Sequence, residues 1–280
     1  MRIDVLIENT LPEPNPLGLA GEHGLSLLLH DGERTILFDT GASPRFLSNA
    51  RKLSLRPETA SAVVLSHGHY DHGGGLEAFL ESFPRPRIFH GKGADGVFRS
   101  KKGSRFKDVG LSGGTLKVLR AFADRVHVID GIAEIMPGFF VFPIREHPHP
   151  PPRGNGNLFR ITDGELEADD FSHEIAAAVD TPEGFVILTG CAHNGVLNIL
   201  ETVKGYLPGP RIAAVVGGFH MRGDPEENSR LPEVAEELLE LAPGARFVTG
   251  HCTADSAYAE LKPVLREHLE HLFTGLRISI

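Results

Sequence analysis

The sequence predicts a layered α/β fold in which two mixed sheets pack face to face with helices outside, and three observations carry this prediction. The apolar runs are short and rich in Val, Ile, Leu and Phe, which favours buried strands over helices. Stretches with a helical period lie between these runs. The strands fall into two batches along the chain, each with helices interleaved or following, so each batch predicts one sheet with its own helices.

The predicted strands share a short apolar run with turn residues nearby. They are Ile3–Ile7, Leu25–Leu29, Thr35–Phe38, Ala62–Leu65, Val126–Ile129, Phe139–Phe142, Ala176–Val179, Phe185–Leu188 and Ala213–Val216. The predicted helices share apolar residues spaced three or four apart. They begin after Ser43-Pro44, at Leu76, at Val196, at Leu231 and at Asp255, the last running to about Leu272 with Pro263 kinking or restarting it.

Length and composition exclude several classes of protein. The chain has 280 residues and a net charge of −9, from 28 Lys+Arg and 37 Asp+Glu. This charge disfavours a nucleic-acid partner, and an apolar content of 41% excludes a disordered chain. No apolar run approaches the roughly 20 residues of a membrane span, and the first residues read as a strand, with no signal peptide. Two cysteines favour a reducing compartment, so we expect a cytoplasmic protein. From the length of the chain we expect a single domain over residues 1–280.

Residues 92–107 concentrate positive charge within this acidic chain. Six basic residues stand against Asp95 alone: Lys92, Arg99, Lys101, Lys102, Arg105 and Lys107. Glycines in this segment predict an irregular loop or lid, within an insertion at about residues 91–125. Two interpretations stay open, a solvated surface loop and a cover that attracts an anionic substrate. In the second, Arg105 is the expected phosphate ligand, since a guanidinium pairs with two oxygens at once, while Lys101, Lys102 and Lys107 act through their field.

The strongest chemical signal follows the predicted strand Ala62–Leu65 directly. Within six residues come His67, His69, Asp71 and His72, and three glycines follow. A loop at a strand end can turn His67 and His69 to one point and Asp71 and His72 to a neighbouring one. Imidazole and carboxylate groups suit zinc, iron or manganese. The motif therefore predicts a metal site.

This His-x-His-x-Asp-His motif resembles the signature of the metallo-β-lactamase fold superfamily, and so does Phe38-Asp39-Thr40-Gly41 at an earlier strand end. The resemblance implies a four-layer αββα sandwich with one or two metals at the rim of its sheets. It also implies that Asp39 orients the His cluster. Three later segments, Gly190–His193, Gly217–His220 and His251–Thr253, resemble motifs of the subfamily named for 7,8-dihydropterin-6-methyl-4-(β-D-ribofuranosyl)aminobenzene-5′-phosphate synthase.

The resemblance also implies roles for the later residues. Either His193 or Cys191 stands where the superfamily has a bridging Asp. Cys191 would be a soft ligand as a thiolate, or would only fill space in the core as a buried thiol. We favour His193 as the ligand. His251 fits the final His ligand, and His220 is a ligand or a general acid. A third ligand of the first metal is expected near residues 169–174. His173 is the first candidate there, with Asp169 and Asp170 as alternatives.

The function implied is hydrolysis of a small anionic, phosphate-bearing substrate by water activated between two divalent metals, zinc being favoured over iron or manganese. Asp71, His220 and Asp39 are the expected catalytic residues. Two alternatives stay open: a synthase or transferase of the dihydropterin type, and a protein that binds metal or senses a metabolite without turnover. We expect no membrane partner, and self-association into a homo-oligomer stays open.

Overall fold

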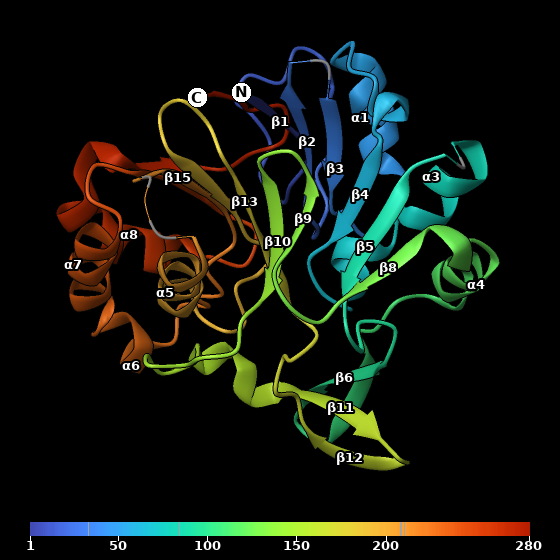
Figure 1. Ribbon diagram of the computed structural model, residues 1–280. Helices are drawn as coiled ribbons and strands as arrows, with labels where there is room; N and C mark the ends of the chain where they lie inside the picture. The colour runs from blue at the N-terminus through green and yellow to red at the C-terminus, as the bar shows by residue number, and fades with distance from the viewer. Residues whose placement is uncertain (33, 84, 208, 210) are drawn as a thin grey trace. The chain divides into compact units, whose positions relative to one another are not determined.

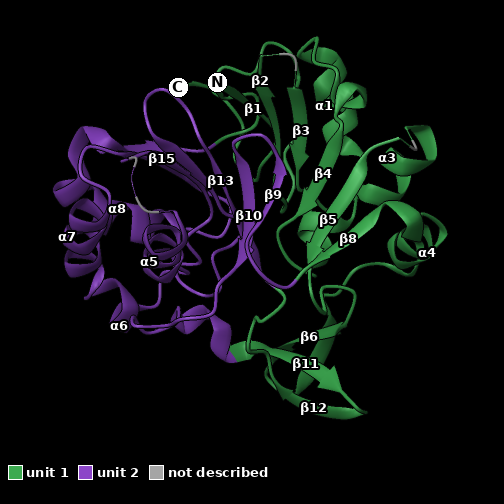
Figure 2. Cartoon of the chain, in the orientation of Figure 1, with its two compact units in different colours: residues 1–129, 157–173, 273–279 green, residues 130–156, 174–272, 280 purple. Residues whose placement is uncertain are grey.

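The computed structural model describes residues 1–32, 34–83, 85–207, 209 and 211–280, which divide into two compact units. Unit 1 comprises residues 1–129, 157–173 and 273–279 (Figure 2). Unit 2 comprises residues 130–156, 174–272 and 280. Each unit has a mixed sheet, helices that cover it and a buried apolar core.

The main sheet of unit 1 has the strand order β18-β1-β2-β3-β4-β5-β8. Its strands are β1 Arg2–Ile7, β2 Ser26–Asp31, β3 Arg34–Phe38, β4 Ala62–Leu65, β5 Arg87–Gly91, β8 Val126–Ile129 and β18 Arg277–Ser279. The strands β3, β4, β5 and β8 run parallel, so the carboxyl ends of β3 and β4 meet at one edge of the sheet.

Three helices of unit 1 connect parallel strands and bury their apolar faces against this sheet. They are α1 Arg45–Lys52, α3 Leu76–Ser82 and α4 Gly113–Ala121 (Figure 1). Phe46 of α1 and Phe79 of α3 are fully buried and pack with Leu37 and Val63 of the sheet. Burial of such side chains contributes roughly 1.5–3 kcal/mol each, which holds the helices on the sheet.

Unit 1 has a second sheet, with the order β12-β11-β6-β7. Its strands are β6 Val97–Lys102, β7 Arg105–Asp108, β11 Leu158–Thr162 and β12 Glu165–Ala168. The segment that we expected to be an irregular basic lid is therefore a β-hairpin, and the expectation of a loop was wrong. Pairing of β6 with β11 decides this conformation, and the paired residues, such as Ser100 and Leu158, lie about sixty residues apart in the chain.

The sheet of unit 2 has the order β17-β16-β15-β14-β13-β10-β9. Its strands are β9 Ala133–Met136, β10 Phe139–Pro143, β13 Ile175–Val179, β14 Phe185–Leu188, β15 Ile212–Gly217, β16 Arg246–Thr249 and β17 Leu269–His271. Strands β14 to β17 run parallel. The helices are α5 Val196–Tyr206, α6 Pro225–Asn228, α7 Leu231–Leu241 and α8 Asp255–Leu265. Leu200, Leu238 and Leu261 bring α5, α7 and α8 into one core with the sheet.

All nine predicted strands are present, with ends that differ by one or two residues. The last helix is shorter than we predicted, since α8 ends at Leu265 and Leu269–His271 forms β17. The backbone leaves the helical conformation at Arg266, which has a φ of 50°, and Leu269 gains burial at the edge of the sheet beside β16. Among the described residues, no helix combines the length and the apolar character that crossing a bilayer requires.

Candidate functional site

The His cluster of unit 1 leaves the carboxyl end of β4 and leads into the short helix α2, Tyr70–Gly73. The Nε2 atom of His67 lies 3.1 Å from Nδ1 of His69, and both rings are buried. The absence of a side chain at Gly68 lets the backbone at Ala94 pack against this loop, because a Cβ atom there would lie 2.3 Å from the carbonyl oxygen of Ala94. The loop therefore holds two imidazole nitrogens side by side.

Asp39, at the end of the neighbouring strand β3, holds both ends of this loop through hydrogen bonds. Its carboxylate accepts hydrogen bonds from the amide and the hydroxyl of Ser66, at 2.8 and 2.7 Å. Its Oδ2 also lies 2.7 Å from Nδ1 of His72, and both side chains are fully buried. If His72 donates its Nδ1 hydrogen to Asp39, its Nε2 is left as an acceptor, which is the form that binds a metal.

Asp71 has a neighbour that the sequence did not indicate. The Nε2 atom of His23 lies 3.1 Å from Oδ2 of Asp71, and the amide of Leu25 donates to the carbonyl oxygen of Asp71. His72 Nε2 lies 3.9 Å from the same Oδ2. His23 has no ligand spacing in the sequence, and no local pattern shows that the chain before β2 returns to the loop after β4.

The structure distinguishes the three candidates for a further ligand in unit 1. Asp170 is exposed and pairs with Arg160. Asp169 is buried, and its Oδ2 lies 3.2 Å from Nε2 of His173 and 4.0 Å from Nε2 of His69. Although burial raises the pKa of Asp169, hydrogen bonds from His173 and from the amide of Phe171 keep it below its usual range. Asp169 is therefore an ionised oxygen donor beside His69.

His173 has polar neighbours at both ring nitrogens. Its Nδ1 accepts a hydrogen bond of 3.2 Å from the amide of Gly68, and its Nε2 faces Asp169. Donor atoms of His69, Asp169 and His173 all lie within 4.8 Å of one another. His173 therefore connects the backbone of the His loop to the carboxylate of Asp169.

The base of the basic hairpin contacts this cluster. The ring of Phe98 lies 4.3 Å from that of His173 and 5.5 Å from that of His69. The ammonium group of Lys107 lies 5.1 Å from the centre of the Tyr70 ring. Lys101, Lys102 and Arg105 are exposed around the turn at Gly103. The hairpin thus carries one predicted cation beside the His loop and the other three at its tip.

In unit 2 the predicted residues follow the parallel strands β14, β15 and β16, whose carboxyl ends meet at one edge. Ala192, His220 and His251 all have φ between 51° and 59°, a region that costs energy for a side chain and recurs at functional sites. The rings of His193 and His220 lie 4.1 Å apart. The turns after three strands therefore gather histidines at this edge.

Glu174 organises the first of these turns and was not predicted from the sequence. Its buried carboxylate accepts hydrogen bonds of 2.8 Å from the amides of His193 and Asn194 and from the Asn194 side chain. Asn155 completes the support, since its Oδ1 lies 3.0 Å from Nδ1 of His193. Glu174 stands next to the predicted candidate His173, but only the tertiary contact reveals its role.

Both cysteines lie in this part of unit 2. Donor atoms of Cys191, His220 and Cys252 all lie within 4.8 Å of one another. The Sγ atom of Cys252 accepts a hydrogen bond of 3.2 Å from the amide of His220. Although burial raises the pKa of the Cys252 thiol, hydrogen bonds with Cys191 and His220 lower it well below its usual range. Cys252 is thus a thiolate candidate that the sequence did not single out.

The protonation states of these donors fit a divalent metal. Burial lowers the pKa of His69 to about 3, so its imidazole is neutral at physiological pH. Neutral imidazole, carboxylate and thiolate are the ligands that zinc and iron take in proteins. The residues of each unit therefore fit metal binding by their chemistry.

The chain is similar to several known proteins. A Methanocaldococcus jannaschii protein named 7,8-dihydropterin-6-methyl-4-(β-D-ribofuranosyl)-aminobenzene-5′-phosphate synthase is 28% identical over 271 residues, covering 91% of this chain and 88% of the relative. The crystal structure of Tm1679, described as a metal-dependent hydrolase of the β-lactamase superfamily, is 32% identical, with a TM-score of 0.81 and coverage of 100% of this chain and 99% of the other.

A more distant structure, Zn²⁺-bound PqqB from Methylobacterium extorquens, shares the fold at 16% identity, with a TM-score of 0.57 and full coverage of both chains. The predicted fold class and the resemblance to the synthase are thereby confirmed. The family model described as the metallo-beta-lactamase superfamily matches residues 19–251, and the chain belongs to this superfamily.

Proposed function

We propose that this protein is a metal-dependent hydrolase acting on a small anionic, phosphate-bearing substrate. The observation that carries the proposal is the buried pair of His67 and His69, whose ring nitrogens lie 3.1 Å apart with the carboxylate of Asp169 near His69. Such a pair of neutral imidazoles is costly to bury unless a cation or a proton lies between the rings. The description of Tm1679 as a metal-dependent hydrolase supports the same reaction class.

We propose two divalent ions, zinc first, with iron or manganese as alternatives. The proposed ligands are His67, His69, Asp71, His72, His193 and His251, with His173 and Cys191 as further candidates. Bound divalent ions supply Lewis acidity and make water a nucleophile at neutral pH. The side chains then have separate tasks. Asp39 holds the tautomer of His72, Asp71 accepts a proton, and His220 donates one to the leaving group.

A second function is favoured by a specific observation, the 28% identity to the named synthase over 91% of this chain. In this alternative the same residues would hold the metals that bind a phosphorylated ribosyl substrate for a condensation reaction. The basic residues of the hairpin suit an anionic substrate in both reactions.

Metal analysis and two activity assays test the proposal. We expect the purified protein to contain zinc, iron or manganese, and His69→Ala to lose the metal while its circular dichroism spectrum is unchanged. We expect hydrolysis of aryl phosphate esters that stops on chelation and returns with metal. Formation of the product named for the relative, detected by mass spectrometry in place of hydrolysis, would assign the synthase instead. Metal content equal in wild type and His69→Ala would overturn both.

A further inference from the structure

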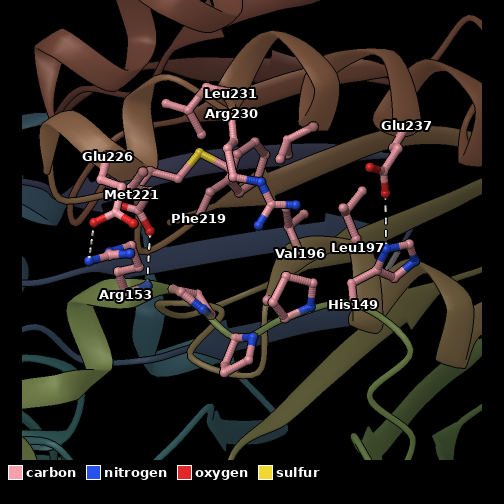
Figure 3. Close-up of a pocket in the computed structure, with 16 residues that line it drawn as sticks. His149, Arg153, Val196, Leu197, Phe219, Met221, Glu226, Arg230, Leu231 and Glu237 are labelled. Atoms are coloured by element: carbon pink, nitrogen blue, oxygen red, sulfur yellow. Dashed lines mark hydrogen bonds and ion pairs between the residues drawn. The ribbon is translucent and has the colours of Figure 1, made fainter.

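Unit 2 contains a cavity of about 310 Å³ on the side of α5, α6 and α7 (Figure 3). Most of its lining is apolar. These apolar residues are Pro150, Pro151, Pro152, Gly195, Val196, Leu197, Phe219, Met221, Leu231 and Val234. The run Pro150–Pro152 forms one wall. A volume of this size suits a molecule with one or two rings.

The carboxylates around this cavity are already engaged. Glu237 lies 2.9 Å from Nδ1 of His149, and Glu226 lies 2.7 Å from the guanidinium of Arg153. Glu227 accepts hydrogen bonds from the amides of Arg153 and Arg222, at 3.0 and 3.2 Å. Each of these carboxylates therefore already has a hydrogen-bond or ion-pair partner within the protein.

Arg230 differs from these residues. Its ion pair, with Glu233, is long at 4.0 Å, and more than half of its side chain is exposed. Figure 3 shows its guanidinium directed into the cavity, toward the segment between His149 and Arg153. A guanidinium at the edge of an apolar cavity binds carboxylate or phosphate oxygens in pairs.

The amino end of α5 adds to this preference. Val196 and Leu197 begin the helix and line the cavity, and no side chain among the described residues caps the helix at Gly195. The first amides of an uncapped helix attract a negative charge. Two independent features, a guanidinium and a helix end, thus favour an anion inside an apolar space.

The cavity adjoins the histidines of unit 2. Phe219 and Met221 line it and flank His220 in the sequence. Gly154, which directly follows the lining residue Arg153, lies so close to His220 that a Cβ atom would stand 3.0 Å from Cδ2 of that ring. Asn155 donates a hydrogen bond of 2.7 Å to the carbonyl oxygen of His193. The segment 149–155 therefore joins the cavity wall to both histidines.

We propose that this cavity is a substrate-recognition site that holds the apolar ring system of an anionic substrate beside His193 and His220, with an anionic group of that ring system paired to Arg230. The proposal rests on the proposed function, because the histidines mark where the reacting bond lies. In this proposal, residues of α5, α7 and the run Pro150–Pro152 determine which substrate binds.

Binding of two matched probes tests the proposal in the purified, metal-containing protein. The probes are 2-naphthoate and its neutral analogue 2-naphthamide, followed by naphthyl fluorescence, which is readily isolated because the chain has no Trp. We expect 2-naphthoate to bind more tightly than 2-naphthamide. Arg230→Gln should weaken binding of 2-naphthoate about fivefold and leave binding of 2-naphthamide unchanged, and so reduce the difference between the two probes. Arg56→Gln, an exposed arginine paired with Glu58 in unit 1, is the matched control.

A second variant tests the place of binding. Val234→Trp adds a large side chain to a half-buried lining residue and should abolish binding of both probes, with Val234→Phe used where the larger ring prevents folding. Binding unchanged in the folded Val234 variant, or equal affinity for the two probes in wild type, would overturn the proposal. Probe binding needs no turnover, so loss of metal or of hydrolysis would refute the proposed function and leave this result standing.

Discussion

Asp39, at the end of β3, and His72, in the helix α2 that follows β4, meet at 2.7 Å in the interior of unit 1, where neither side chain is exposed. A carboxylate that accepts from a histidine fixes the ring's tautomer and orientation. Because Asp39 also binds Ser66, one carboxylate connects the strand end of β3 to both ends of the His loop.

Asp39→Asn should weaken metal binding about 10-fold to 100-fold, because the amide loses the charge that orients His72. Asn tolerates the φ of 58° at this position, so the loop keeps its conformation. Zinc affinity measured by competition with a chelator checks this expectation. Asp31→Asn, a half-exposed carboxylate paired with Arg34, is the control. Equal zinc affinity in Asp39→Asn and wild type would show that Asp39 does not orient the ligand.

The metal-free protein should lose stability as the pH falls below 7. Burial lowers the pKa of His69 from 6.5 to about 3, so the unfolded chain binds a proton between these values that the folded chain does not. The stabilisation is complete above pH 6.5 and is lost as the pH falls toward 3, by about 2 kcal/mol between pH 7 and pH 5 for this residue. Urea unfolding at both pH values measures it.

His69→Gln provides the comparison, since the amide does not titrate while the other histidines are kept. Its free energy of unfolding should fall by about 2 kcal/mol less than that of wild type over the same pH interval. If the free energy of unfolding changed equally with pH in wild type and His69→Gln, this result would contradict the burial of a neutral His69.

Gly68→Ala should destabilise the protein by about 1–3 kcal/mol, because the added Cβ would meet the Ala94 carbonyl oxygen at 2.3 Å and the Phe98 ring at 2.5 Å. The same clash should displace the amide that donates to His173 and reduce zinc affinity. Thermal unfolding and zinc titration measure the two effects. In Gly113→Ala the added Cβ meets nothing within 4 Å, so that variant should match wild type. A Gly68→Ala protein as stable as that control would refute the close packing.

Charge reversal at the hairpin tip, Lys101→Glu with Lys102→Glu, should lower kcat/KM for an anionic phosphate ester at low salt and leave kcat unchanged. The field of these lysines draws the substrate in, and salt screens it over about 8–10 Å. Steady-state kinetics at low and high salt check both points. The double variant Lys117→Glu and Lys204→Glu changes the net charge equally on the exposed faces of α4 and α5. An equal loss in this control would assign the effect to net charge rather than to the hairpin.

Much of the fold, and the clustering of the histidines after β4, could be predicted from the sequence, because those signals are local. The spacing of apolar residues predicts β4 and α5 from a few residues of chain. The spacing of His67, His69, Asp71 and His72 after β4 likewise predicts metal ligands without reference to any distant segment. The family resemblance then implies that Asp39 orients the His loop, and the structure places Asp39 at the end of the neighbouring parallel strand β3.

The tertiary structure alone decided the features that depend on partners remote in sequence. Pairing of β6 with β11 converts the expected basic lid into a hairpin, and addition of Leu269 beside β16 ends the last helix early. His23 beside Asp71 and Glu174 beneath His193 carry no spacing signal at all. Asp169 and Asp170 are adjacent and chemically identical, and only burial against His173, or exposure beside Arg160, makes one a donor to the cluster and the other a surface ion pair.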